Sequence, residues 1–154
     1  MEPLDIFFNR TCKIFRHPTK EWNKDGLLHR EDGPAMEYAD GHKEWWVNGK
    51  LHREDGPAIV RKGGTKAWYL NDELHREDGP AVERSDGDKR WYLNGLLHRV
   101  DGPACEWGNG SKEWWMNGVE LTEEEFNQWI AKKKFAEKLT EQLEVKPAHK
   151  RVKI

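Results

Sequence analysis

Cysteine is scarce in this sequence, with only Cys12 and Cys105 among 154 residues. Two cysteines so far apart give neither a disulfide framework nor a zinc-binding spacing, which predicts a reduced, cytoplasmic protein without a metal or other cofactor. Long apolar runs are missing too, and the opening residues MEPLD lack the basic start of a secretory signal. The sequence therefore predicts no contact with a membrane.

The sequence also has few apolar residues and no large excess of one charge. Only 36% of the residues are hydrophobic, and a chain this polar would be disordered without another source of buried area. Nine tryptophans, five phenylalanines and three tyrosines supply that area. The net charge is only -2, which argues against binding of DNA, RNA or an acidic membrane. We expect one folded domain of ordinary size.

One string of eight amino acids, LHREDGPA, organises the rest of the chain. It begins at Leu28, returns at Leu51 and Leu74, and returns again at Leu97 with Val100 in place of the glutamate. These starting positions are evenly spaced, so the sequence has a constant 23-residue period without insertion or deletion. A fixed period of this length indicates an array of structural repeats stacked on one another.

Each repeat has the pattern of a β-hairpin followed by a loop. In the first, we expect strands over 35–39 and 43–47, with Asp40-Gly41 at the hairpin tip and Asn48-Gly49 turning the chain into the next repeat. Asp-Gly and Asn-Gly suit type I′ turns, whose two central residues need positive φ. The other tips lie at 63–64, 86–87 and 109–110. Asn71-Asp72 has no glycine, so the aspartate there must adopt the left-handed conformation.

Alternation along the strands predicts which side chains pack together. One apolar column comes from the outgoing strands: Met36, Ile59, Val82 and Cys105. Another comes from the returning strands: Trp45, Trp68, Trp91 and Trp114, which share a face with Val47, Leu70, Leu93 and Met116. The opposite face of the returning strands carries a second aromatic column: Trp46, Tyr69, Tyr92 and Trp115. Aromatics on both faces are unusual for a sheet with one wet side, so this column is either covered by the protein itself or is a binding surface.

The ends of the chain depart from the repeat. The sequence divides into an N-terminal segment with a degenerate capping half-repeat, four full repeats, a helix and a basic, flexible tail: 1–27, 28–119, 120–143 and 144–154. Thr122 and Glu125 form a capping box for the helix, which presents Phe126, Trp129 and Ile130. We expect the helix to close the open end of the sheet or to pair with another subunit.

A hairpin repeat of this period, with a glycine before the outgoing strand, Asp-Gly at the tip and an aromatic residue on the returning strand, resembles the MORN repeat (membrane occupation and recognition nexus). The resemblance covers residues 13–119 and departs where MORN units carry a second glycine, since Pro34 and Ala35 follow Gly33 here. The string WYLNGLLHRVDGPA at 91–104 is more similar to repeat proteins of bacteriophages and large DNA viruses, which often end in a similar TEEEF helix. The resemblance implies an all-β repeat, a single-layer antiparallel hairpin meander with a C-terminal α-helix, a viral origin and no enzymatic activity.

Each repeat places a histidine beside an arginine: His29-Arg30, His52-Arg53, His75-Arg76 and His98-Arg99. Equivalent positions lie two strands apart, about 9 to 10 Å, so the four histidines cannot share one metal ion, whose ligands lie within about 2.1 Å of it. Each arginine can form a salt bridge with the aspartate two residues later and so pin a glycine-containing loop. Repetition favours this structural role, because architecture repeats while binding sites seldom need every copy. The alternative is a row of arginines that binds phosphates or carboxylates of a partner.

No serine, cysteine or paired carboxylate stands in a catalytic setting, so we expect a binding protein and no enzyme. The first expectation is a phage-encoded protein that docks onto a host protein in the host cytoplasm and inhibits or scaffolds it, for example in counter-defence. The alternative is sequestration of a small nucleotide-type ligand in pockets at oligomer interfaces. Unpaired sheet edges and the second aromatic column predict a homo-oligomer, most simply a two-fold dimer. The candidate binding residues are that column and the four His-Arg pairs.

Overall fold

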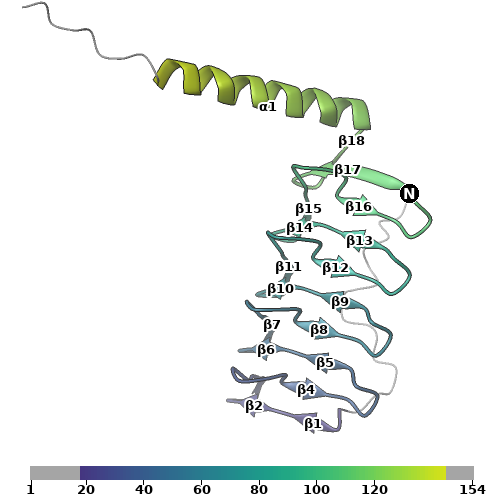
Figure 1. Ribbon diagram of the computed structural model, residues 1–154. Coiled ribbons are helices and arrows are strands. Elements are labelled where there is room, and N and C mark those ends of the chain that lie inside the picture. Colours follow the sequence, from purple (N-terminus) through teal and green to yellow (C-terminus); the bar gives the residue numbers. More distant parts are fainter. Residues whose placement is uncertain (1–17, 145–154) are drawn as a thin grey trace, which may run out of the picture.

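The computed structural model describes residues 18–144, which form eighteen short strands followed by one helix (Figure 1). The predicted all-β array of antiparallel hairpins with a C-terminal helix is confirmed. The expectations for residues 1–17 and for the basic tail after residue 144 lie outside the described part of the chain. Within residues 18–144, no helix combines the length and the apolar character needed to cross a membrane.

Ten strands pair into one antiparallel sheet that runs the length of the array, called here the long sheet. In spatial order they are β1 (Lys20–Glu21), β4 (Met36–Glu37), β5 (Lys43–Glu44), β8 (Ile59–Val60), β9 (Lys66–Ala67), β12 (Val82–Glu83), β13 (Lys89–Arg90), β16 (Cys105–Glu106), β17 (Lys112–Met116) and β18 (Val119–Leu121). The half-repeat before residue 28 supplies β1, which pairs with β4 through Glu21 opposite Met36. The array therefore begins one hairpin earlier than the first LHREDGPA string.

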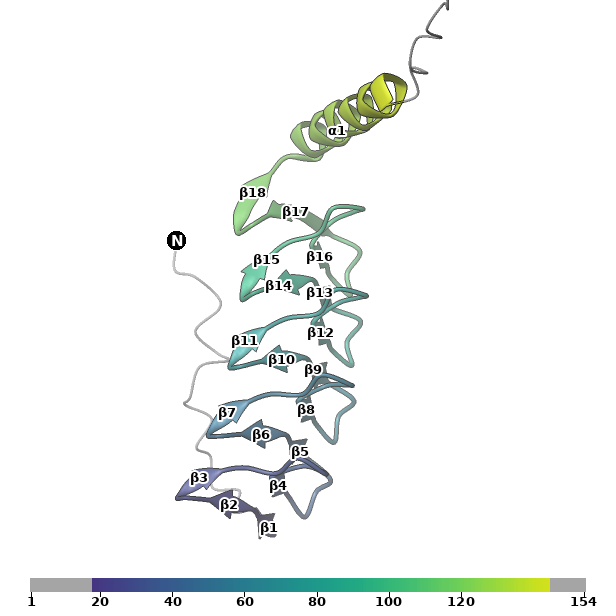
Figure 2. The same ribbon diagram turned by 90° about the vertical axis from the view of Figure 1, so that its left-hand side faces the viewer.

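The remaining strands form four two-stranded inner hairpins beside the long sheet. They are β2 (Asn23–Lys24) with β3 (Leu27–Leu28), β6 (Trp46–Val47) with β7 (Lys50–Leu51), β10 (Tyr69–Leu70) with β11 (Glu73–Leu74), and β14 (Tyr92–Leu93) with β15 (Leu96–Leu97). Successive inner hairpins are joined by backbone bonds: the Gly49 N–H donates to Leu28 O at 2.8 Å and the Arg30 N–H donates to Trp46 O at 3.0 Å. Figure 2 shows these hairpins stacked next to the long sheet.

The returning strand expected over 43–47 is split at Trp45 into β5 and β6. The Trp45 N–H donates to Ala58 O at 2.8 Å, while its carbonyl accepts from the His52 N–H at 3.1 Å, so this residue bonds both to the next outgoing strand and to the next loop. Trp68 and Trp91 make the same pair of bonds. The strand thus passes from the long sheet into an inner hairpin, and its two halves face different neighbours (Figure 2).

Two kinds of turn alternate along the chain. The inner turns have positive φ at both central residues, as type I′ turns require, and Asp72 takes φ 72° as expected. The expectation of type I′ turns at the tips was wrong. At the first tip only Gly41 has positive φ (89°); its N–H donates to Tyr38 O, and Tyr38 N–H donates to His42 O. Three residues therefore lie in the loop, and the glycine occupies the bulge position that follows a tight turn.

The core lies between the long sheet and the inner hairpins. It contains Ile59, Val82, Tyr69, Tyr92 and small alanines at the corners of the units: Ala35, Ala58, Ala81 and Ala104, all fully buried. The outgoing column is confirmed as a packed face by the burial of its last three members, including Cys105. Tyr69 and Tyr92, at 6% exposure, belong to the core as well, so the protein covers this part of the second aromatic column itself. Trp45 and its equivalents are only half-buried and flank the core.

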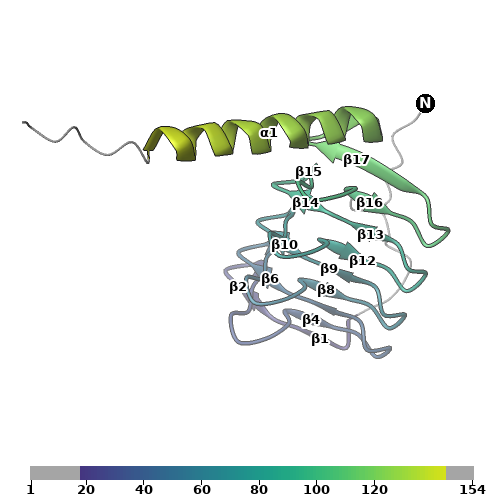
Figure 3. The same ribbon diagram turned by 45° about the horizontal axis from the view of Figure 1, so that its top comes forward.

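Helix α1 (Glu123–Glu144) starts with the expected capping box and then leaves the array (Figure 3). The Thr122 N–H donates to Glu125 Oε2 at 2.8 Å, and the Glu125 N–H donates to Thr122 Oγ1 at 3.2 Å. Phe126 is buried in the first turn, whereas every residue from 131 to 142 is exposed, including Phe135 at 70%. Phe126 and Phe135 are nine positions apart, which is two and a half turns, so they point to opposite sides of the helix.

Candidate binding surfaces

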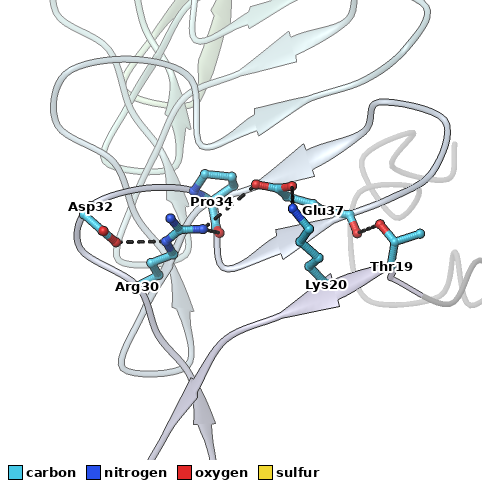
Figure 4. Close-up of polar contacts among 6 residues, drawn as sticks. All are labelled: Thr19, Lys20, Arg30, Asp32, Pro34 and Glu37. Atoms are coloured by element: carbon cyan, nitrogen blue, oxygen red, sulfur yellow. Dashed lines mark hydrogen bonds and ion pairs between the residues drawn. The ribbon is translucent and has the colours of Figure 1, made fainter.

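The loops that follow the inner hairpins, at 29–34, 52–57, 75–80 and 98–103, hold their arginines in the same way in every unit; we call them the HRxD loops. In the first, Arg30 Nε donates to Asp32 Oδ1 at 2.8 Å and Nη1 donates to Pro34 O at 3.3 Å (Figure 4). Its guanidinium stacks 4.0 Å above the Trp22 ring. The expected Arg–Asp salt bridge is therefore present, and it recurs at 2.8, 2.8 and 2.7 Å in the next three loops.

The guanidinium also packs directly on the loop glycine. A Cβ added to Gly56 would lie 3.0 Å from Arg53 Cζ, and the other three loops have the same close approach. A glutamate on the outgoing strand adds a further contact in three units, at 3.0 Å from Arg76 to Glu83, 2.8 Å from Arg99 to Glu106 and 3.9 Å from Arg30 to Glu37. Each arginine therefore forms polar contacts within its own unit and stacks on the tryptophan of the unit before it.

The arginine holds its carboxylate partner in the charged form. A hydrogen bond from Arg53, and then its positive charge, lower the pKa of Asp55 below the usual aspartate range, and Asp32 and Asp78 behave alike. These aspartate side chains are 82 to 84% exposed, so solvent screens the ion pair strongly. Most of what the arginine contributes must then come from its stacking and its bonds within the unit.

The four histidines tie each loop to the following inner turn. The Asn48 backbone N–H donates to His29 Nδ1 at 3.1 Å, and three equivalent bonds of 3.2 to 3.3 Å follow along the array. The same Nδ1 of His29 lies 2.9 Å from Asn48 Oδ1, and Nε2 faces Glu31 at 3.4 Å. Each histidine thus occupies a different interface between units. Among residues 18–144, no group of three or more His, Cys, Asp or Glu side chains could hold a metal ion.

The second aromatic column differs between the middle and the ends of the array. Tyr69 and Tyr92 are buried, and burial raises the pKa of Tyr69 to about 12. Trp46 and Trp115 are half-buried, and their indole N–H groups donate to a glutamate two residues earlier, at 2.9 Å to Glu44 and 3.2 Å to Glu113. Only the two tryptophans could touch a partner without rearrangement of the core.

Sequence reasoning missed a set of residues near the hairpin tips at which the units differ. They flank the hairpin tips in two columns, which we call the tip row: Tyr38, Arg61, Arg84 and Trp107 on the outgoing side, and His42, Thr65, Asp88 and Ser111 on the returning side. In each unit the backbone N–H of the first column donates to the carbonyl of the second, at 2.9 to 3.0 Å, so the eight residues are neighbours across the sheet. A position-by-position comparison of the four repeats would have found them, because the amino acid changes from unit to unit at these positions and is nearly constant in the HRxD loops.

Aromatic and charged groups alternate along the tip row. At one end the Tyr38 and His42 rings lie 4.7 Å apart, and His42 Nε2 is 2.9 Å from Glu44 Oε1. Burial, and then the charges of Glu44 and Glu21, raise the pKa of Tyr38 to about 12. At the other end the Arg90 guanidinium lies 4.6 Å from the half-buried Trp107 ring. Between them, Arg61 and Arg84 are exposed.

A shallow groove of about 720 Å³ lies between the third and fourth HRxD loops. Arg76, Trp91, His98 and Val100 contribute to its lining. Arg99 already stacks on Trp91 at 3.9 Å and donates to Asp101, so these polar groups of the groove lining are already bonded within the protein. Val100 replaces the loop glutamate of the other units and makes this groove less acidic than the equivalent places along the array.

Comparison of the chain with protein-family models, with curated proteins and with solved structures finds no match. The resemblance to MORN repeats and to phage repeat proteins therefore stays a prediction. Function has to be inferred from the geometry of the array.

Proposed function

We propose that this chain is a non-enzymatic binding protein whose repeat array docks onto another protein. One observation carries the proposal: the polar side chains that repeat in the HRxD loops bond within the array, whereas the side chains of the tip row vary from unit to unit. Arginine, aspartate and histidine of the HRxD loops bond to their own unit or to its neighbour. The tip row presents a different pair of side chains at every unit. A regular scaffold carrying a non-repeating surface is typical of repeat proteins that recognise proteins.

The partner we propose is a host protein. The resemblance to repeat proteins of bacteriophages supports this choice, and docking in the host cytoplasm would inhibit or scaffold the target, as a counter-defence factor does. The four units would offer a surface three repeat spacings long, about 29 Å at two strand spacings per unit. A surface of this length can contact several residues of a protein partner, whereas a small molecule would cover only a small part of it.

Affinity capture followed by cross-linking tests the proposal. The full chain is expressed in a bacterial host, and amine-reactive cross-links are mapped from exposed lysines on both sides of the long sheet: Lys62 at a hairpin tip, and Lys43, Lys66, Lys89 and Lys112 in the strands. We expect one host protein in stoichiometric amount, cross-linked to the array at several units. A protein recovered without cross-links to the array, or no protein at all, would contradict the proposal.

A second candidate function is sequestration of a nucleotide-type ligand, which the groove between the third and fourth loops favours. The groove places Trp91 and two arginines together, which could stack a base and hold a phosphate. Because Arg76 and Arg99 already bond to aspartates at 2.8 and 2.7 Å, a phosphate would have to displace a carboxylate from each. Native mass spectrometry of the purified protein decides the matter: a retained mass of a few hundred daltons would favour this candidate.

A further inference from the structure

We propose that the tip row is the recognition surface and that it binds an extended acidic segment of the partner, with apolar or aromatic side chains at the ends of that segment. This inference rests on the proposed function and specifies the chemistry of the partner. It follows from the order of side chains along the row, from their exposure and from the charge of the rest of the array.

The middle of the row carries two arginines, with Asp88 opposite Arg84. Arg61 and Arg84 stand at equivalent places in neighbouring units, about 9 to 10 Å apart, with Thr65 between them. Lys62 adds a third exposed cation at the same tip as Arg61. Arg84 keeps only long contacts to its own unit, 3.4 Å to Asp86 and 3.7 Å to Asp88, and its side chain is 41% exposed. A ligand carboxylate can therefore compete with these two aspartates for the Arg84 guanidinium, and guanidinium–carboxylate bonds are among the strongest available.

Aromatic side chains flank these two arginines on both sides. Tyr38, stacked on His42, lies one unit before Arg61, and Trp107 lies one unit after Arg84. All three rings are partly exposed. An extended chain rises about 3.3 Å per residue, so nine residues span the distance from Tyr38 to Trp107. Three of those residues cover each spacing between neighbouring units, which places acidic residues in the middle of the segment and apolar ones at its ends.

The overall charge selects a short acidic peptide over a nucleic acid. Residues 18–130 hold 15 Lys and Arg against 23 Asp and Glu, so the cations of the tip row are a local exception on an acidic array. A polynucleotide carries a phosphate at every residue and would meet this negative field along its whole length. A peptide can confine its negative charge to the part of the row that holds Arg61, Lys62 and Arg84. The chain's own N-terminal segment, residues 1–17, does not have that character, because it holds three basic and two acidic side chains.

Selection from a display library tests the inference without knowledge of the partner. The intact protein is used to select from random 12-residue peptides, and recovered peptides are measured by fluorescence anisotropy. We expect enrichment of Asp and Glu at central positions with aromatic or large apolar residues toward the ends. The doubly substituted Arg61→Gln, Arg84→Gln protein should bind these peptides at least tenfold more weakly.

The matched control is Lys66→Gln with Lys89→Gln, which removes the same charge from the same two units but on the opposite face of the long sheet. This control should change the affinity by less than twofold, and thermal melting should show both variants folded. Recovery of no binding peptide, of peptides without acidic enrichment, or of peptides equally sensitive to both double variants would overturn the inference. Tighter binding of a labelled oligo(dT) strand, lost in Arg61→Gln, Arg84→Gln, would instead assign the row to nucleic acid.

The same variants separate this inference from the proposed function. If the host protein found by affinity capture binds Arg61→Gln, Arg84→Gln as well as the unchanged protein, the array is a docking protein but the tip row is not its surface. If neither protein captures a host partner and no peptide is selected, both proposals fail.

Discussion

Substitution of Arg76 by alanine should strongly destabilise its HRxD loop. The guanidinium stacks 4.1 Å above Trp68, donates to Pro80 O at 3.2 Å and to Glu83 at 3.0 Å, and its side chain is only 21% exposed. Stacking of a partly desolvated cation contributes about 1 kcal/mol, and each of the two bonds about 1 kcal/mol more. We therefore expect the free energy of unfolding to fall by about 3 kcal/mol, and Tm by roughly 10 °C.

Urea denaturation followed by tryptophan fluorescence measures this loss, with Arg84→Ala as the control. Arg84 is an arginine of the same unit with long, exposed ion pairs, and its removal should change stability by less than about 0.5 kcal/mol. Arg76→Lys keeps the charge next to Asp78 but loses the planar stacking and the forked donors. It should therefore recover less than half of the loss. Full recovery by lysine would show that the screened Arg–Asp ion pair stabilises the loop, and it would refute the assignment of stability to stacking.

The loops, the core and the helix each give a further testable outcome. The pKa values of Asp32, Asp55 and Asp78 are lowered in the folded state, so the stability that these ionised carboxylates contribute is present at neutral pH. That stability is lost as the pH falls through and below the usual aspartate range. Acid denaturation should therefore shift to higher pH when the loop arginines are removed. Tyr69 and Tyr38 should both stay protonated to about pH 12, so tyrosinate absorbance should show a late titration that Tyr69→Phe reduces and that Tyr69→Phe with Tyr38→Phe reduces further. Stability should drop as the pH rises above the ordinary tyrosine range. Thr122→Ala should destabilise the start of α1 by about 1 kcal/mol in amide exchange, whereas Thr140→Ala in the exposed part of the helix should not.

Self-association remains a prediction, but its basis has changed. Tyr69 and Tyr92 are inside the array and cannot form an interface between copies. Phe135 and Leu139, at 70% and 49% exposure, lie on the side of α1 away from the Phe126 contact and offer a small apolar surface. Light scattering at micromolar concentration should therefore report any dimer, and Phe135→Glu should dissociate it. A dimer unaffected by this substitution would have to pair through another surface.

The sequence alone determined the features that depend on short-range chemistry. The constant period placed the hairpins in register because nothing is inserted between units. Asn-Gly pairs required left-handed turns, and Asp72 had to follow them where glycine is missing. Thr122 and Glu125 formed their capping box because both partners lie within one turn of helix. The Arg–Asp salt bridge was also predictable, since its partners are only two positions apart in the loop.

The tertiary structure decided which faces are inside. Alternation assumes an unbroken strand, and on that assumption Tyr69 and Tyr92 stood opposite the packed side. The strand instead turns at Trp68 and Trp91, where the backbone bonds to a small alanine of the next outgoing strand and to the next loop. Ala81 and Ala104 are fully buried at these corners, which leaves room for the inner hairpin to fold against the long sheet. That change of direction carries the tyrosines into the core and leaves the tryptophans at its edge under their arginines. It depends on contacts between residues of different units, which no pattern within a single repeat contains.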